Sequence, residues 1–151
     1  MKQTTLSGIL CAAFLLGACA SNQQTTACPA ITAPEEGVRV LVLSDETNQP
    51  IEVRLNGVKA SCSKLKSDMV LMEINLGLKV KRNLNANDGN GSVGIPVLTA
   101  IVAETGEVIR NDRQIYVAGY KEGEAVKYPV AEFDQKVPAG ARLVISLAPS
   151  Q

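Results

Sequence analysis

Cysteine has the widest chemical repertoire of the residue types in this sequence, because a thiol can be alkylated, oxidised to a disulfide, bound to a metal or used as a nucleophile. The 151-residue chain has four cysteines, at positions 11, 19, 28 and 62, and no histidine. It therefore lacks the commonest general base near neutral pH and a frequent metal ligand. No two cysteines have the C-x-x-C spacing of zinc and redox sites. These features disfavour a metal centre and an enzyme.

Two other segments contain suitable residue types without the setting that chemistry needs. The run SCSK (61–64) matches S-x-x-K, but penicillin-binding enzymes use that motif with two partner motifs that this sequence lacks. The run NANDGNG (85–91) has a composition found in calcium loops, but Asp88 is its only carboxylate. Asn, Asp and Gly also tolerate the positive φ angles of turns. We predict no catalytic residue, no metal and no cofactor.

The first 18 residues have the features of an export signal. Lys2 gives a short basic start, and residues 6–18 are apolar but shorter than the roughly 20 residues that span a bilayer as a helix. The end of the segment, Leu16-Gly17-Ala18-Cys19, resembles the lipobox of bacterial lipoproteins. The resemblance implies cleavage before Cys19, a thioether-linked lipid on its sulfur and acylation of the new amine.

Cys11 serves as an internal comparison for this assignment. It follows Leu10, which does not fit the small residue required before the cut. Two or three acyl chains would anchor the protein firmly, because each buried methylene contributes about 0.8 kcal/mol. The alternative is an ordinary secretory signal whose cut happens to precede a cysteine. Ala20 and Ser21 follow Cys19. By resemblance to the sorting rule of Gram-negative lipoproteins, the absence of Asp at the second position implies the outer membrane, with the domain facing the periplasm.

Cys28 and Cys62 remain after Cys11 leaves with the leader and Cys19 takes the lipid. An even pair in an exported protein favours a disulfide, which would tie the start of the domain to an inner strand. Closing a loop of this size contributes about 3.5–4 kcal/mol in the chain-entropy model. A metal pair and a buried pair of free thiols are the alternatives.

Composition places the mature chain among single-domain globular proteins. Removal of residues 1–18 leaves 133 residues, with fourteen basic and fifteen acidic side chains. This near-neutral balance argues against a nucleic-acid partner. We predict a signal peptide over 1–18, a lipidated cysteine and flexible tether over 19–36, and one folded domain over 37–151.

Alternating and β-branched segments indicate an all-β domain. The clearest is 69–82, where apolar residues at even positions would form one buried face. In 51–63, the pair Asn56-Gly57 favours a bulge within one strand over a tight turn between two. Pro96 stands near the start of an apolar, central strand. The expected strands are 38–43, 51–63, 69–82, 95–104, 107–117, 125–130 and 141–148.

About seven short strands with regular turns predict a single antiparallel β-sandwich. Along the chain, a long strand with a cysteine is followed by an amphipathic strand, a Gly-rich loop, an apolar strand, a Gly turn and a final VPAGARLVISL. It resembles small β-sandwich outer-membrane lipoproteins of alphaproteobacteria, most of them uncharacterised. The resemblance implies an Ig-like or fibronectin-like sandwich and names no activity.

A structural or protein-interaction role follows from these expectations. We expect a lipid-anchored accessory subunit that binds a protein partner in the cell envelope. The alternative is a ligand- or inhibitor-type binding module that uses the loop 83–94. Six basic residues lie in neighbouring elements: Lys59, Lys64, Lys66, Lys79, Lys81 and Arg82. They either form a basic patch that binds peptidoglycan or lipopolysaccharide, or they are solvated side chains that protect strand edges. Met69 and Leu71 are either a partner-binding stripe or covered by the rest of the domain. The possible partner-contact residues are Asn87, Asp88, Asn90, Lys79 and Lys81.

Overall fold

Strict alternation of apolar and polar side chains produces the strand at the centre of the fold. Met72, Ile74 and Leu76 of β4 (Met69–Lys81) are buried, whereas Glu73 and Asn75 between them are exposed. A strand places successive side chains on opposite faces, so this pattern gives β4 one face for the core and one for solvent. The period-2 prediction for this segment is confirmed.

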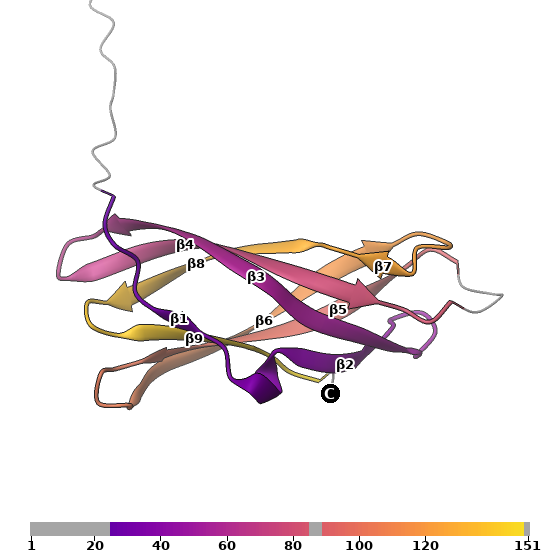
Figure 1. The fold of residues 1–151 in the computed structure, drawn as a ribbon, viewed down its shortest axis with the longest axis horizontal. Helices are drawn as coiled ribbons and strands as arrows, with labels where there is room; N and C mark the ends of the chain where they lie inside the picture. Colours follow the sequence, from indigo (N-terminus) through magenta and orange to yellow (C-terminus); the bar gives the residue numbers. More distant parts are fainter. Residues whose placement is uncertain (1–24, 85–88, 150–151) are drawn as a thin grey trace, which may run out of the picture.

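A computed structural model describes residues 25–84 and 89–149. Its elements are β1 (Ile31–Thr32), η1 (Glu35–Gly37), β2 (Arg39–Leu43), β3 (Pro50–Lys64), β4, β5 (Gly91–Val102), β6 (Val108–Tyr120), β7 (Val126–Lys127), β8 (Val130–Pro138) and β9 (Arg142–Leu147). One sheet has the order β1-β9-β5-β6. The other has the order β2-β3-β4-β7, with β8 also paired to β4. The two sheets form the predicted all-β sandwich (Figure 1).

An almost entirely aliphatic core fills the space between the sheets, as the scarcity of aromatic residues requires. Burying this apolar surface supplies the main favourable free energy of folding. The largest fully buried side chains are Ile51, Met72, Ile74, Leu76, Leu78, Ile95, Leu143 and Ile145. One polar pair crosses the core, where Gln135 Nε2 donates to Thr99 Oγ1 at 3.3 Å.

A bulge bends β3 where the sequence predicts one. Its register to β4 shifts between Leu55 and Val58, and the intervening Gly57 has a φ of 97°. Gly77 of β4 lies beneath the bulge, since a Cβ built there would stand 2.8 Å from the main-chain oxygen of Asn56. The pair Asn56-Gly57 is therefore a bulge within one strand and does not form a turn.

Three local expectations differ from the structure. The segment after 125–130 continues into β8, which pairs with β4 along its whole length. β1 pairs in parallel with β9, so the sandwich is not purely antiparallel. Pro96 lies in the middle of β5, where its missing N–H is tolerated because β9 pairs with β5 only from Val97 onward and Ala148 N–H donates to the Pro96 oxygen.

The molecule has two ends with different contents (Figure 1). The Cys28 end contains the turns after β3, β5 and β8, together with the segment where the described chain begins. Thr25 forms a β-bridge to Ser63 at this end. The Tyr120 end contains the connections 44–49 and 121–125 and the described parts of the connection between β4 and β5, residues 82–84 and 89–90. The chain therefore enters the fold at one end, and these three connections lie at the other.

Within the described ranges, no helix has the length and hydropathy needed to cross a membrane.

Candidate functional site

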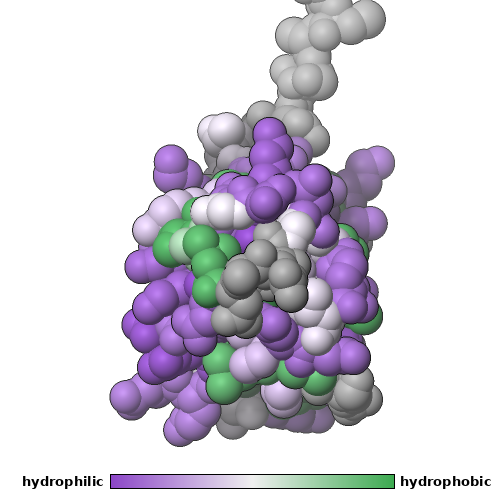
Figure 2. Space-filling model, turned by 90° about the vertical axis from the view of Figure 1, so that its right-hand side faces the viewer, coloured by the Kyte–Doolittle hydropathy of each residue, from purple (hydrophilic) through white to green (hydrophobic). Residues whose placement is uncertain are grey.

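The Tyr120 end contains the most developed polar cluster among the described residues. Figure 2 views the molecule from this end and shows a largely hydrophilic surface with separate hydrophobic areas. Tyr120 ends β6, Ser44 and Glu46 follow β2, and Ser92 is the second residue of β5. The cluster therefore joins connections that belong to both sheets.

Tyr120 and Ser44 form the inner part of this cluster. The two side chains are buried, and their hydroxyl oxygens lie 2.8 Å apart. The Tyr120 hydroxyl also lies 3.2 Å from Glu46 Oε2, to which it can donate. A buried hydroxyl without a partner costs free energy, so these contacts fix the relative positions of β6 and the 44–49 connection.

Glu46 closes the cluster on its outer side. The Ser92 main-chain N–H donates to both carboxylate oxygens, at 2.9 Å each. This main-chain hydrogen bond is the largest cause that lowers the pKa of Glu46 below its ordinary value, and it outweighs desolvation, which acts to raise the pKa. Glu46 is therefore held ionised and ties the 44–49 connection to β5.

Arg82 places a positive charge under the same end. Its side chain is only 7% exposed, and its guanidinium carbon lies 3.7 Å from the centroid of the Tyr120 ring. Its Nη2 donates to the Lys121 carbonyl at 2.9 Å, and its Nε donates to the Glu124 carbonyl at 3.1 Å. Arg82 was assigned to a possible surface basic patch, and this assignment is wrong because the ring and the 121–125 connection cover it.

The cluster holds neighbouring segments of the chain together, and the cavity beside it is too small for a reacting molecule. The cavity beside Ser44, Arg82 and Tyr120 measures about 10 Å³. That volume has room for about one water molecule, too little for a substrate next to the Ser44 hydroxyl. The hydrogen bonds therefore serve to hold the three connections in a fixed arrangement.

A row of cations crosses the outer face of the β2-β3-β4 sheet near this end. Arg39 pairs with Arg54, and Arg54 pairs with Lys79, so three positive side chains stand side by side. Like charges in directly opposed positions repel each other. Glu52 reduces that repulsion, because its carboxylate contacts Arg39 at 2.7 Å and also contacts Arg54.

Lys81 and Tyr128 extend this row into a larger surface. Lys81 pairs with Glu52 in the adjacent row, and Lys79 Nζ lies 5.8 Å from the centroid of the exposed Tyr128 ring. Tyr128 also lines an open groove of about 580 Å³ over the β3 bulge. We call this surface the cationic face; it consists of Arg39, Glu52, Arg54, Lys79, Lys81 and Tyr128.

The residues predicted from sequence separate into distinct places. Lys79 and Lys81 lie on the cationic face, whereas exposed Asn90 lies in the 82–90 connection and its Oδ1 accepts from the Glu122 N–H at 3.0 Å. Asn87 and Asp88 lie outside the described residues, and so does Cys19.

The predicted disulfide is present. Cys28 and Cys62 are bonded, with their Cα atoms 5.3 Å apart. This excludes, for the oxidised protein, the alternatives of a metal pair and of two free thiols at these positions.

Sequence reasoning missed Ser44, Glu46 and Tyr120 at the polar cluster and Arg39 and Arg54 on the cationic face. Alternation indicates which side chains of a strand point outward, but the row of Arg39, Arg54 and Lys79 depends on strand register. Tyr120 was the detectable signal, since the hydroxyl of a buried tyrosine usually has a hydrogen-bond partner.

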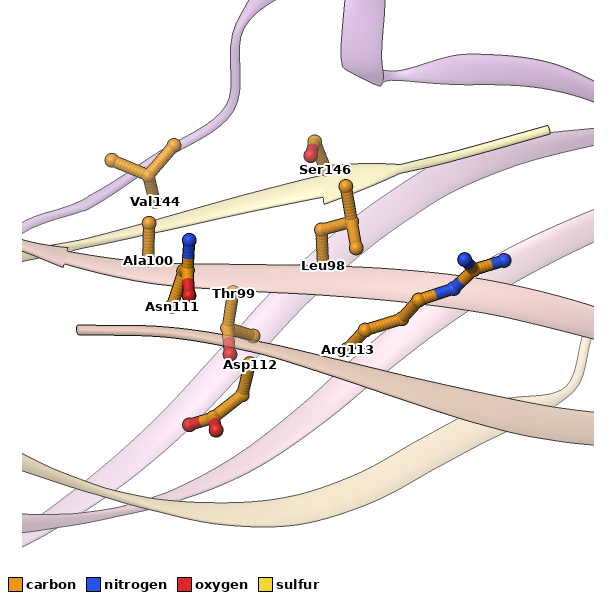
Figure 3. A pocket seen from close by; sticks show the side chains of 8 residues that line it. All are labelled: Leu98, Thr99, Ala100, Asn111, Asp112, Arg113, Val144 and Ser146. Atoms are coloured by element: carbon orange, nitrogen blue, oxygen red, sulfur yellow. The ribbon is translucent and has the colours of Figure 1, made fainter.

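A second depression lies on the outer face of the other sheet (Figure 3). It measures about 390 Å³ and is formed where small side chains, including Ala100 and Ser146, stand among larger ones. The side chains of Thr99 and Asp112 point away from it, toward the opposite face of the sheet. No converging set of acid, base and nucleophile lines it.

Within residues 25–84 and 89–149, no group of three or more His, Cys, Asp or Glu side chains is arranged to hold a metal ion. No protein-family model, no curated protein and no solved structure matches this chain.

Proposed function

We propose that this protein is a lipid-anchored interaction module of the bacterial cell envelope, and that it holds a protein partner to the outer membrane as an accessory subunit. The proposal takes its anchor from Cys19 and the lipobox-like residues before it. The proposed interaction surface is the cationic face, and this face is the main observation that supports the proposal. By the resemblance of its lipobox and its strand pattern, we group the protein with the small sandwich lipoproteins of alphaproteobacteria.

The arrangement of the two ends supports this role. The described chain begins at the Cys28 end, where a disulfide fixes it to β3. The cationic face and the clamped connections lie toward the Tyr120 end (Figure 1). A module tethered through its N-terminus would thus hold its most structured polar surface away from the point of attachment. Disulfides persist in oxidising compartments, which agrees with a location outside the cytoplasm.

The cationic face has the composition of a protein-binding surface for an acidic partner. It combines arginine and an exposed tyrosine, both enriched at interfaces, with a net positive charge. Exposed Leu41 of β2 stands next to Glu52 in the same row as Lys81, and this adds apolar area beside the charges. We therefore expect the partner to present carboxylates around an apolar contact.

Charge reversal on the cationic face tests the proposal. The double variant Lys79→Glu, Lys81→Glu should lose at least tenfold of the partner recovered with the protein from detergent-solubilised native membranes. The matched control, Lys64→Glu with Lys66→Glu, reverses two exposed lysines at the Cys28 end and should retain the partner. Equal recovery with both variants would exclude the cationic face as the interaction surface.

The anchor is tested separately by the mass of the mature protein. Cleavage before Cys19 with added acyl chains is expected, and Cys19→Ala should release the domain from the membrane fraction. An unlipidated N-terminus would remove the anchor from the proposal while leaving the interaction surface to be judged by the charge-reversal variants.

A further inference from the structure

β6 is a long strand at the open edge of its sheet. It has 13 residues and pairs with β5 on one side only, and no other described strand pairs with it. An unpaired strand edge can accept another strand, and natural proteins usually block this with charges, prolines or short strands. β6 therefore requires an explanation that the shorter edges of the molecule do not.

The C-terminal half of β6 lacks the usual protection. Residues 114–120, QIYVAGY, contain no charge and no proline. Ile115 and Val117 are 64% and 61% exposed on the outer face. By comparison, β8 at the edge of the other sheet alternates outward Glu132, Asp134 and Lys136 and ends at Pro138. Segments such as 114–120 are typical sites of strand pairing between chains.

The hydrogen bonds of β5 show which groups of β6 face this open edge. Gly119 pairs with Ser92, whose N–H donates to Glu46 and whose oxygen accepts from Asp45, so the Ser92 groups point away from β6. Ile115 pairs with Pro96, whose oxygen accepts from Ala148 on the other side.

Main-chain groups alternate in direction along an antiparallel strand, so this direction extends to every second residue of β6. The N–H and C=O groups of Arg113, Ile115, Val117 and Gly119 therefore point to the open edge. Lys127 Nζ already donates to the Gly119 oxygen at 2.6 Å, which agrees with this direction. The edge at 113–117 remains available for pairing.

We propose that β6 pairs antiparallel with β6 of a second copy of this chain, about a two-fold axis beside Tyr116. This register places Ile115 of each copy opposite Val117 of the other, both with outward main-chain groups. It places Arg113 opposite Gly119, so no two like charges face each other. The two four-stranded sheets become one continuous sheet across the dimer.

Self-complementarity favours a second copy over an unrelated strand. A two-fold interface requires one surface to match itself, and the sequence of β6 does so in this register. A register centred on Arg113 would oppose two arginines, and one centred on Ile115 would oppose Arg113 and Val117. The pairing uses the sheet opposite the cationic face, so it is independent of the proposed partner surface and of the lipid.

Cysteine cross-linking of the full chain in cell envelopes tests the register. In the double variant Ile115→Cys, Val117→Cys, the cysteine at 115 of one copy lies opposite the cysteine at 117 of the other. Their Cα atoms are about 5.5 Å apart, which is within disulfide range. Either single variant aligns its cysteines only diagonally, at about 7–8 Å. Mild oxidation should give at least five times more cross-linked dimer from the double variant than from either single variant.

The controls distinguish pairing from random collision. Val130→Cys, at the start of β8 in the other sheet and 48% exposed, should cross-link no better than the single variants. The Val117→Lys full-chain protein should be monomeric by light scattering in detergent, and Val130→Lys should remain dimeric. Equal cross-linking by all variants would overturn the dimer. So would a folded wild type that is monomeric by light scattering together with a double variant that does not cross-link, and this is the result expected if β6 binds a different protein.

Discussion

Glu46 shows how one exposed carboxylate organises a whole end of the molecule. It accepts from the Ser92 main chain and contacts the Tyr120 hydroxyl, and that hydroxyl in turn contacts Ser44. Three segments far apart in sequence thus meet through one side chain. Because the contacts with Ser92 and Tyr120 both use the acceptor oxygens of Glu46, the ionised form is the one that fits the native fold.

The lowered pKa of Glu46 predicts a pH dependence of stability. A carboxylate with a lower pKa in the folded protein than in the unfolded chain stabilises the fold above its unfolded pKa, and this contribution is lost as the pH falls through the folded pKa. Glu46→Gln should therefore lower the melting temperature at pH 7 and have a progressively smaller effect as the pH falls below about 4. Melting curves from pH 7 to pH 3 measure the difference.

Glu132→Gln provides the comparison for this experiment, because Glu132 is an exposed carboxylate on β8 outside the cluster. Its melting temperature should follow the wild type across the range. A Glu46→Gln deficit that stayed constant down to pH 3 would mean that the charge of Glu46 contributes nothing and that only its shape matters.

At the scale of elements, the β3 bulge and β4 depend on each other through a glycine. A Cβ at position 77 would lie 2.8 Å from the Asn56 main-chain oxygen, so the two strands approach too closely for any other residue. Gly77→Ala should push the bulge outward and cost about 1–3 kcal/mol, the usual range for overpacking. Urea denaturation followed by circular dichroism measures the loss of unfolding free energy.

Gly89→Ala is the matched substitution, because a Cβ at position 89 meets no atom within 4 Å. It should change the unfolding free energy by less than about 0.5 kcal/mol, as most surface substitutions do. Comparable losses in the two variants would show that the effect at position 77 does not come from contact with the bulge.

The elements also show why some parts of the fold were predictable and others were not. β4 was evident because every inward residue from Met72 to Val80 is large and apolar. β8 was missed because its inward positions include a small residue, Ala131, and a polar one, Gln135, which weaken the alternation. Gln135 is buried because Thr99 on the facing sheet accepts its hydrogen bond. The sequence pattern reveals a strand only when its inward side chains are clearly apolar and its outward side chains clearly polar.

The candidate site was less predictable than the fold for a related reason. Lys79 and Lys81 were identified as outward residues of one strand, yet their neighbours Arg39 and Arg54 come from two other strands. The register that aligns them depends on the bulge at Asn56 and on the β2–β3 connection. Arg82, the next residue after Lys81, falls inside because the chain leaves the sheet there and the Tyr120 ring covers it.

At the scale of the whole molecule, the disulfide decides how firmly the N-terminal segment belongs to the sandwich. Residues 25–34 cross from β3 to the other sheet with little secondary structure of their own, since β1 has two residues. Cys28–Cys62 closes a loop with a sequence separation of 34 and ties this segment to a buried strand position. In a tethered protein, a pull on the N-terminus would reach the hydrogen-bonded contacts of Thr25 and Thr26 with β3 first, and this covalent bond would resist it next.

Replacement of both cysteines by serine is therefore predicted to loosen one end of the molecule before it affects the other. The chain-entropy model gives a loss of about 3.5–4 kcal/mol in unfolding free energy for a loop of this length. Amide exchange should rise most in residues 25–34 and least in the 44–49 connection, which the Glu46 cluster holds independently. Reduction of the wild type should reproduce both effects, and the serine variant should not respond to reductant. Uniform acceleration of exchange at both ends would show instead that the disulfide stabilises the sandwich as a single unit, and that the N-terminal segment is not the part of the fold that yields first.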